Sequence, residues 1–178
     1  MRLYILLFTC MILAGITYQD LRSRSVSWIL FPLLAGMGII LTFMEFPSVT
    51  HIMCLFVINS GFLLCQYFLL HTYYFIRDRR LTRIIDSRIG WGDLLFLLSA
   101  CFFFSPLNFF IFYLGSLVFS IAIHLLMVSR NKTPGAPAVV IPLAGLQAGL
   151  LSLVLILSFF FNLPVADDNW QLTKYFLP

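Results

Sequence analysis

Two aspartates, Asp20 and Asp93, each stand at the end of an apolar stretch that we expect to cross a membrane. A carboxylate at a lipid boundary is costly, and such acids usually serve a function. The second acid belongs to the sequence Gly90-Trp91-Gly92-Asp93, in which the glycines leave space around the carboxylate. Two acids in comparable positions suggest a catalytic dyad, in which one group takes up a proton while the other gives one.

The composition places the chain among integral membrane proteins. Of its 178 residues, 61% are apolar and only 10% are charged, whereas about a quarter of the residues of a soluble domain carry a charge. The 20 phenylalanines suit helices that face lipid. We expect a lipid bilayer as the surroundings of this chain and no nucleic-acid partner.

Six apolar segments must position the two acids, at roughly 3–18, 28–44, 52–76, 92–104, 109–128 and 138–161. They predict an all-α bundle of six transmembrane helices with short loops. The first and fourth segments approach the length of a span, about 20 residues, only if their aspartate-bearing ends are helical. We therefore expect both acids near a membrane interface, one transmembrane domain over residues 1–161, and an interfacial tail over residues 162–178.

The basic residues predict the orientation of the bundle, because loops rich in lysine and arginine stay in the cytoplasm. Of the 11 basic residues, only Arg2 and Lys174 fall on one side of the predicted membrane. The others lie in the loops after the first, third and fifth segments and are Arg22, Arg24, Arg77, Arg79, Arg80, Arg83, Arg88, Arg130 and Lys132. This distribution predicts an amino terminus and a tail outside, both aspartates at the cytoplasmic face, and basic loops on anionic lipid head groups.

Three stretches of the chain carry a family resemblance. Residues 20–26 read Asp-Leu-Arg-Ser-Arg-Ser-Val, residues 90–93 read Gly-Trp-Gly-Asp, and residues 141–146 read Ile-Pro-Leu-Ala-Gly-Leu. In the order and spacing of these stretches the chain resembles the type IV prepilin and preflagellin peptidases, which are membrane aspartyl proteases of the GxGD type. It departs from the family pattern at Ser27-Trp28, where Pro-Asn is common, and at Leu95, where a lysine is common.

The resemblance implies an endopeptidase that removes the short cytoplasmic leader of prepilin-like precursors, as in type IV pilus assembly and protein secretion. Asp20 and Asp93 would activate a water molecule, without a metal or another cofactor. The implied location is the inner (cytoplasmic) membrane of a bacterium or archaeon, with several membrane crossings and the catalytic site at the cytoplasmic face.

The loop after the first segment is too short for the zinc-binding insert that accompanies methyltransferase activity in many bacterial members of this family. The cysteines fall inside apolar segments and lack the spacing of metal ligands; they are Cys10, Cys54, Cys65 and Cys101. We therefore expect a short form with peptidase activity and without methylation of the product.

Five further residues are candidates for binding the substrate or shaping the site. Gly90 and Gly92 permit close approach of a substrate or of another helix, or they only let the helix begin after the loop. Trp91 either contacts the substrate or anchors the chain at the interface. Arg88 is a candidate substrate contact, although its loop also sets the topology, and Pro142 opens the last helix in the third matching stretch.

The last apolar segment carries a second glycine pattern. Gly145 and Gly149 form a Gly-x-x-x-Gly pair, which permits close approach of two helices. This pair could hold the last helix against the helices that carry the acids, or against another neighbour.

A small transporter is the alternative from another class of function. Facing acids in a helix bundle can also conduct protons or bind a cation. The sequence shows no inverted repeat and no paired broken helices, which are typical of secondary transporters, and both acids are predicted near one face. Cleavage of a precursor would distinguish the two functions.

Overall fold

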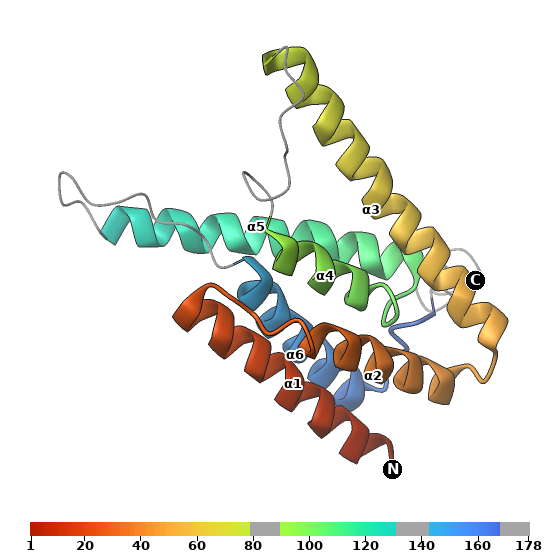
Figure 1. Ribbon diagram of the computed structural model, residues 1–178. Coiled ribbons are helices and arrows are strands. Elements are labelled where there is room, and N and C mark those ends of the chain that lie inside the picture. Colours follow the sequence, from red (N-terminus) through yellow and green to blue (C-terminus); the bar gives the residue numbers. More distant parts are fainter. Residues whose placement is uncertain (79–89, 131–142, 168–178) are drawn as a thin grey trace, which may run out of the picture.

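The computed structural model describes residues 1–78, 90–130 and 143–167. These ranges contain six helices and no strand (Figure 1); the helices are α1 (Arg2–Ser23), α2 (Leu30–Glu45), α3 (Val49–Asp78), α4 (Trp91–Ala100), α5 (Pro106–Arg130) and α6 (Leu143–Phe161). The all-α class predicted from the sequence is confirmed for the described part of the chain.

Four of the helices are long and apolar enough to cross a membrane, namely α1, α3, α5 and α6. The other two are shorter, with 16 residues in α2 and 10 in α4. At a rise of 1.5 Å per residue, α4 is about 15 Å long, which is about half of the hydrocarbon thickness of a bilayer. The structure therefore supports a membrane protein with at least four long apolar helices, while six complete crossings stay a prediction.

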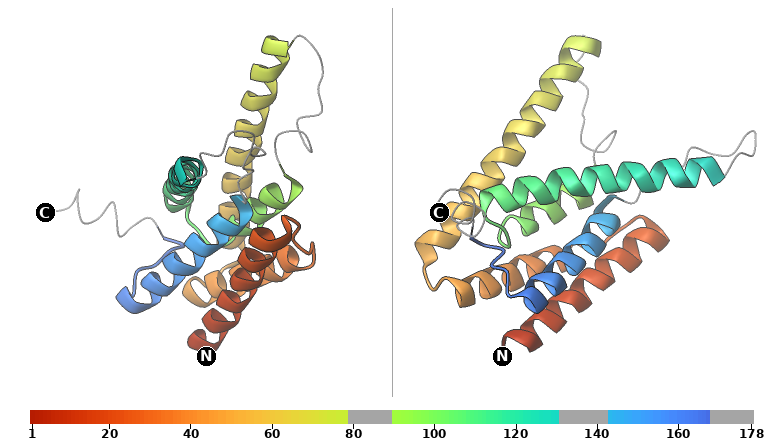
Figure 2. Two further views of the ribbon diagram at one scale, coloured as in Figure 1. Left: turned by 90° about the vertical axis from the view of Figure 1, so that its left-hand side faces the viewer. Right: turned by 180° about the vertical axis from the view of Figure 1, so that it is seen from behind.

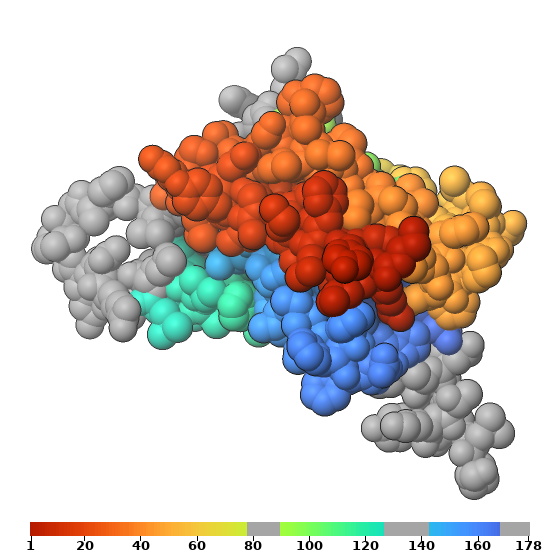
Figure 3. Space-filling model, turned by 90° about the horizontal axis from the view of Figure 1, so that it is seen from below, coloured from red at the N-terminus to blue at the C-terminus, as the bar shows by residue number. Residues whose placement is uncertain are grey.

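Helices α1, α2 and α6 form one packed layer. Helix α1 lies between α6 and α2, with its most extensive packing on α6 (Figure 3). Helix α2 also packs on α4, and α6 reaches both α4 and α5. Apolar side chains from these helices are buried between them, including Leu13, Leu34, Phe96 and Leu151. This core joins the two helices that carry the aspartates.

Helices α3 and α5 diverge from each other and from this layer. The carboxyl-terminal half of α3 stands apart from the other helices in all three ribbon views (Figures 1 and 2). Only 17% of the apolar window of α3 and 22% of that of α5 are buried. Large apolar side chains such as Phe68 and Leu125 are consequently exposed, as expected for surfaces that face lipid.

Two helix ends near the site differ from the predicted segments. Helix α1 continues through Asp20 to Ser23, and the chain turns at Arg24, which has a left-handed conformation with φ of 52°. Helix α4 ends at Ala100, although the apolar run predicts a helix to residue 104. The predicted start of the last segment at residue 138 lies outside the described residues, among which α6 begins at Leu143.

The early end of α4 has a cause elsewhere in the sequence. The carbonyl groups of Cys101 and Phe104 accept hydrogen bonds from Asn59 Nδ2 of α3, at 3.0 and 2.8 Å. The carbonyl of Phe102 accepts one from Thr42 Oγ1 of α2, at 2.7 Å. Two neighbouring helices thus hold residues 101–104 in a turn.

The first residues after α6 fold back onto the start of α5. The backbone N–H of Ser105 and the side chain of Asn108 both donate hydrogen bonds to the Val165 carbonyl, at 3.1 and 2.9 Å. Ala166 is buried. The first part of the predicted tail is thus packed against protein, while residues 168–178 lie outside the described part, and the domain boundary at 161 stays a prediction.

Candidate active site

Asp20 lies on the buried face of α1. The residues buried along this helix include Leu6, Thr9, Leu13, Ile16 and Asp20, which are spaced alternately by three and four positions and therefore share one face of the helix. This face packs on α6. The carboxylate thus occupies a position that would suit an apolar side chain, and it is only 8% exposed.

The first turn of α6 supplies a partner for the Asp20 carboxylate. The Gly145 backbone N–H donates a hydrogen bond to Asp20 Oδ2 at 2.6 Å. The Gly145 carbonyl accepts a hydrogen bond from Thr17 Oγ1 at 3.1 Å. Because the amino-terminal end of a helix has free N–H groups and a partial positive charge, it is a favourable place for a carboxylate.

Gly145 permits this close approach of α1 and α6. A Cβ atom at this position would lie 3.0 Å from Asp20 Cβ and 3.3 Å from the carbonyl oxygen of Thr17. At Gly149, the other glycine of the pair, a Cβ atom would meet nothing within 4 Å. Of the two glycines, only Gly145 lies at the helix contact that the sequence pattern predicts.

Asp93 lies in the first turn of α4 and curls back toward its beginning. Gly90 is the N-cap residue of this helix, and its backbone lies next to the Asp93 carboxyl group. An acidic side chain three residues after the N-cap often reaches back in this way. The carboxylate can approach Gly90 because this residue has no side chain. A Cβ atom at this position would lie only 3.2 Å from Asp93 Oδ2.

Helix α6 also connects the two acids. The backbone of Ala144 lies beside the Asp93 carboxyl group, next to the Gly145 N–H that binds Asp20. The two carboxyl groups are close enough to interact electrostatically. The structure thus brings the two predicted acids together at consecutive backbone groups of one helix start.

The other candidate residues differ in their relation to the acids. A Cβ atom at Gly92 would lie 3.9 Å from the Phe31 ring, in ordinary contact distance, so this glycine lies against α2. Trp91 is 52% exposed, which agrees with an interfacial anchor and leaves it open to a partner. Arg88 and Pro142 lie outside the described residues.

A cavity of about 260 Å³ opens beside Asp93, between α3, α4, α5 and α6. We call it the Asp93 cavity, and its lining residues are Leu63, Gln66, Tyr67, Leu70, Asp93, Leu94, Leu97, Tyr113, Leu117, Leu143 and Gln147. Most of these side chains are apolar. An acid at the wall of an apolar cavity can act on the polar part of a molecule that is otherwise held by hydrophobic contacts.

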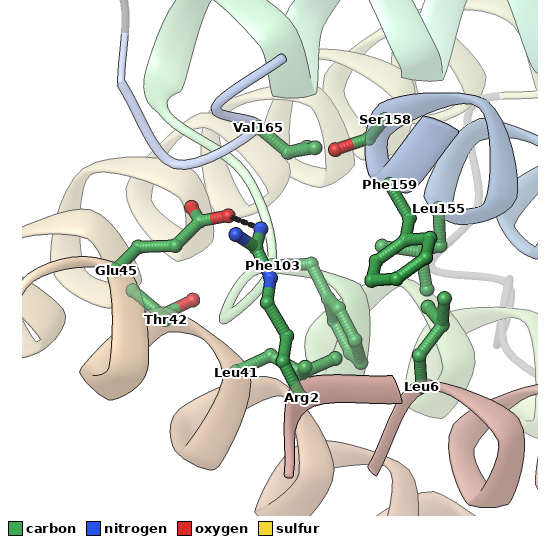
Figure 4. A pocket seen from close by; sticks show the side chains of 10 residues that line it. All are labelled: Arg2, Leu6, Leu41, Thr42, Glu45, Phe103, Leu155, Ser158, Phe159 and Val165. Atoms are coloured by element: carbon green, nitrogen blue, oxygen red, sulfur yellow. Dashed lines mark hydrogen bonds and ion pairs between the residues drawn. The ribbon is translucent and has the colours of Figure 1, made fainter. Parts of the chain in front are cut away.

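A much smaller cavity, of about 30 Å³, lies near the amino-terminal end of α1 (Figure 4). Arg2 forms an ion pair there with Glu45 of α2. Leu6, Leu41 and Phe103 contribute apolar walls. Because neither aspartate of the pair lines it, this cavity is separate from the candidate active site.

Gln147 is the residue of this region that sequence reasoning missed. It lies on α6, is fully buried, and lines the Asp93 cavity. Its signal in the sequence is a single amide within an apolar helix, a kind of residue that often marks a polar contact inside a membrane protein. In the described part of the chain, no three His, Cys, Asp or Glu residues form a group that could hold a metal ion.

No protein-family model, curated protein or solved structure matches this chain. The resemblance to the prepilin peptidases therefore rests on the three sequence stretches. Of these, the structure describes the first two in full and the third from Leu143 onward.

Proposed function

We propose that this protein is a membrane aspartyl endopeptidase that removes the short cytoplasmic leader of a prepilin-like precursor with Asp20 and Asp93. The observation that carries the proposal is the meeting of the two carboxyl groups at Ala144 and Gly145. These acids come from distant parts of the sequence, and both belong to motifs that resemble those of the family. The Asp93 cavity supports it further, because an apolar wall suits a substrate that is itself a membrane helix.

In the proposed reaction the two acids share one proton. The ionised carboxylate takes a proton from water, the resulting hydroxide attacks the scissile carbonyl carbon, and the protonated partner donates its proton to the carbonyl oxygen. The C–N bond of the tetrahedral intermediate then breaks, the amine receives a proton from the acid that first took one, and the other carboxylate recovers its proton from a hydroxyl group of the intermediate as the C=O bond forms again. The N–H groups at the start of α6 hold the two carboxyl groups in place during these transfers.

The proposed orientation places the amino terminus outside and the carboxylates at the cytoplasmic edge of an inner membrane. It follows from the basic loops, because lysine and arginine are retained in the cytoplasm. In this orientation all six helices cross or enter the bilayer, α2 and α4 being the short ones. A leader in the cytoplasm would then reach the acids while the following helix of the precursor stays in lipid.

The test is cleavage of a panel of prepilin-like precursors by the purified protein in lipid. We expect the wild-type protein to cut at least one precursor, and Asp20→Asn and Asp93→Asn each to lower kcat by at least about 100-fold, because each removes one proton-transfer group. Asp78→Asn is the matched control, since it makes the same change at the end of α3, which projects away from the site (Figure 1). All variants must insert and give the same size-exclusion profile.

Two results would contradict the proposal. One is the absence of cleavage for every precursor, and the other is full activity in either Asp→Asn variant. In either case proton or cation flux through reconstituted vesicles becomes the next measurement, because paired acids in a helix bundle can also carry ions.

A further inference from the structure

One residue that lines the Asp93 cavity, Gln147, has a buried polar atom without a partner. Gln147 Nε2 donates a hydrogen bond to Ser116 Oγ of α5 at 3.1 Å, whereas Gln147 Oε1 is buried and has none. The orientation of the amide follows from Ser116, whose hydroxyl donates its proton to the Tyr113 carbonyl at 2.8 Å. A hydroxyl that has used its proton can only accept, so the NH2 group of Gln147 must face Ser116.

This arrangement leaves the acceptor Gln147 Oε1 without a hydrogen-bond donor. Buried polar groups in folded proteins are nearly always hydrogen-bonded, and an unpaired one is costly. Because the residue lines the cavity, a small rotation of its side chain would expose Oε1 to a molecule that fills the cavity, and that molecule could then supply the missing donor. The unpaired oxygen of Gln147 therefore indicates that the occupant of the cavity carries a hydrogen-bond donor.

The position of Gln147 relates this acceptor to the acids. It follows Ala144, whose backbone lies beside the Asp93 carboxyl group, by three residues on α6. Residues three apart lie on the same side of a helix, and three residues advance about 4.5 Å along its axis. The acceptor thus belongs to a residue that lies about one helical turn beyond Ala144, in the direction from the start of α6 toward its end.

A substrate with a helix that begins beside the acids fits this geometry. An acyl chain would fit the apolar cavity but carries no hydrogen-bond donor. The middle of a substrate helix has no free N–H either, because its N–H groups are paired within the helix. The first turn of a helix, however, leaves four N–H groups without internal partners. We propose that Gln147 Oε1 accepts a hydrogen bond from such a free backbone N–H of the substrate, just beyond the bond cut at Asp93, and so positions that bond.

This inference rests on the proposed peptidase function and adds a binding contact to it. The substrate that it selects is a peptide whose extended segment at the cut passes directly into a membrane helix. Gln147 is a positioning residue, since it holds the substrate and takes no part in the proton transfers.

The first experiment compares Gln147→Leu with Ser120→Ala in cleavage of a precursor that the wild-type protein cuts. We expect Gln147→Leu to raise KM about tenfold with little change in kcat, because the contact is made equally in the ground and transition states. Its Tm without precursor should not fall, since the substitution also removes an unpaired acceptor. Ser120→Ala removes a bond within α5, from Ser120 Oγ to the Ser116 carbonyl, and Ser120 is not among the described residues that line the cavity, so its KM should stay within about twofold of the wild-type value.

A second measurement separates substrate binding from cleavage. A photoreactive benzoylphenylalanine replaces Leu117, in the cavity wall, in an Asp20→Asn background that cannot cut. We expect a crosslink to the precursor that weakens when Gln147→Leu is added. A precursor that crosslinks in this way but is never cut by the wild-type protein would overturn the peptidase proposal and leave the contact in place.

The positioning role of Gln147 is wrong under several distinct outcomes. It fails if Gln147→Leu leaves both KM and the crosslink unchanged in a protein that cleaves normally. It also fails if Ser120→Ala raises KM as much as Gln147→Leu does, because the change in KM would then come from disturbed packing of α5. A crosslink to lipid in place of precursor would show that an acyl chain occupies the cavity.

Discussion

Asp20 illustrates how a single buried carboxylate can be both a structural and a chemical group. It continues the apolar face of α1, yet its oxygen accepts the Gly145 N–H at the start of α6. A helix start stabilises such an anion without another charged side chain. The same contact fixes the carboxylate opposite Asp93, so packing of the two helices and alignment of the acids depend on one another.

Gly145→Ala tests this dependence. The added Cβ would press on Asp20 Cβ and on the backbone of Thr17, so α1 must shift, and overpacking of this kind costs about 1–3 kcal/mol. We expect a lower unfolding free energy and a loss of kcat/KM of up to about 100-fold, since small displacements of catalytic groups can have that effect. Unfolding in a lipid–detergent mixture and precursor cleavage measure the two quantities.

Gly149→Ala is the control for this prediction. A methyl group there meets no atom within 4 Å, and alanine favours a helix over glycine by up to about 1 kcal/mol. Its stability should be unchanged or raised and its activity retained. Equal behaviour of the two variants would show that the close contact at Gly145 does not hold the acids in place.

At the residue scale, the sequence predicts which acids form the candidate site better than it predicts which groups these acids contact. Asp20 and Asp93 stand out because acids are rare in apolar segments, and the structure brings them together. The partners of these acids are backbone groups of Ala144 and Gly145, and any residue type supplies a backbone N–H. Gln147 also escapes prediction, since its missing partner is visible only once α5 and α6 are packed.

At the scale of elements, the short helix α4 depends on its neighbours. Its ten residues place Asp93 at one end and the turn of residues 101–104 at the other. Asn59 of α3 and Thr42 of α2 bind the carbonyl groups of this turn. Ser99 adds a hydrogen bond from α4 to the Phe31 carbonyl of α2 at 2.9 Å. These contacts hold α4, and with it Asp93, against the remaining helices.

Asn59→Leu should therefore loosen α4. The substitution keeps a similar volume but leaves the carbonyls of Cys101 and Phe104 without this donor, and unpaired buried groups cost about 1–3 kcal/mol each. We expect the unfolding free energy to fall by about 2 kcal/mol or more, with faster hydrogen exchange over residues 97–104. Ser60→Ala, one position along α3, removes only a local bond to the Val57 carbonyl and should have little effect. Unchanged exchange in Asn59→Leu would show that the turn is stable without α3.

These contacts also explain which helix ends the sequence predicts poorly. Between Asp93 and residue 104 the sequence contains no glycine or proline that would end a helix, and the residues that end it, Asn59 and Thr42, lie on other helices. The start of α5 at Pro106 has a local signal, since proline suits the first position of a helix, yet the apolar run predicts this start only at residue 109. Six helices could be predicted because apolar length alone indicates them, whereas the ten-residue length of α4 follows from tertiary contacts.

At the scale of the whole molecule, the two ends of α1 have different chemistry. Asp20 lies near one end with Asp93 and α6, while Arg2 pairs with Glu45 near the other (Figure 4). If α1 crosses the membrane, as its length permits, these two groups face opposite sides. The basic loops predict that the Asp20 side faces the cytoplasm, the side on which the proposed peptidase would cut a leader peptide.

This orientation predicts opposite accessibility for two exposed loop positions. Ser25 lies between α1 and α2, and Ser48 lies between α2 and α3. Each is replaced by cysteine in a variant without the native cysteines, which are Cys10, Cys54, Cys65 and Cys101. A membrane-impermeant maleimide added to intact bacterial spheroplasts should label Ser48→Cys, and should label Ser25→Cys only after the membrane is opened.

The labelling pattern also bears on α2, because the two positions lie at its opposite ends. Its 16 residues extend about 24 Å, somewhat less than the hydrocarbon thickness, and the helix can cross if the bilayer thins locally. Labelling of both positions from the same side would mean that α2 enters the membrane without crossing it. The reverse of the expected pattern would place Asp20 and Asp93 outside, and a cytoplasmic leader could then not reach them.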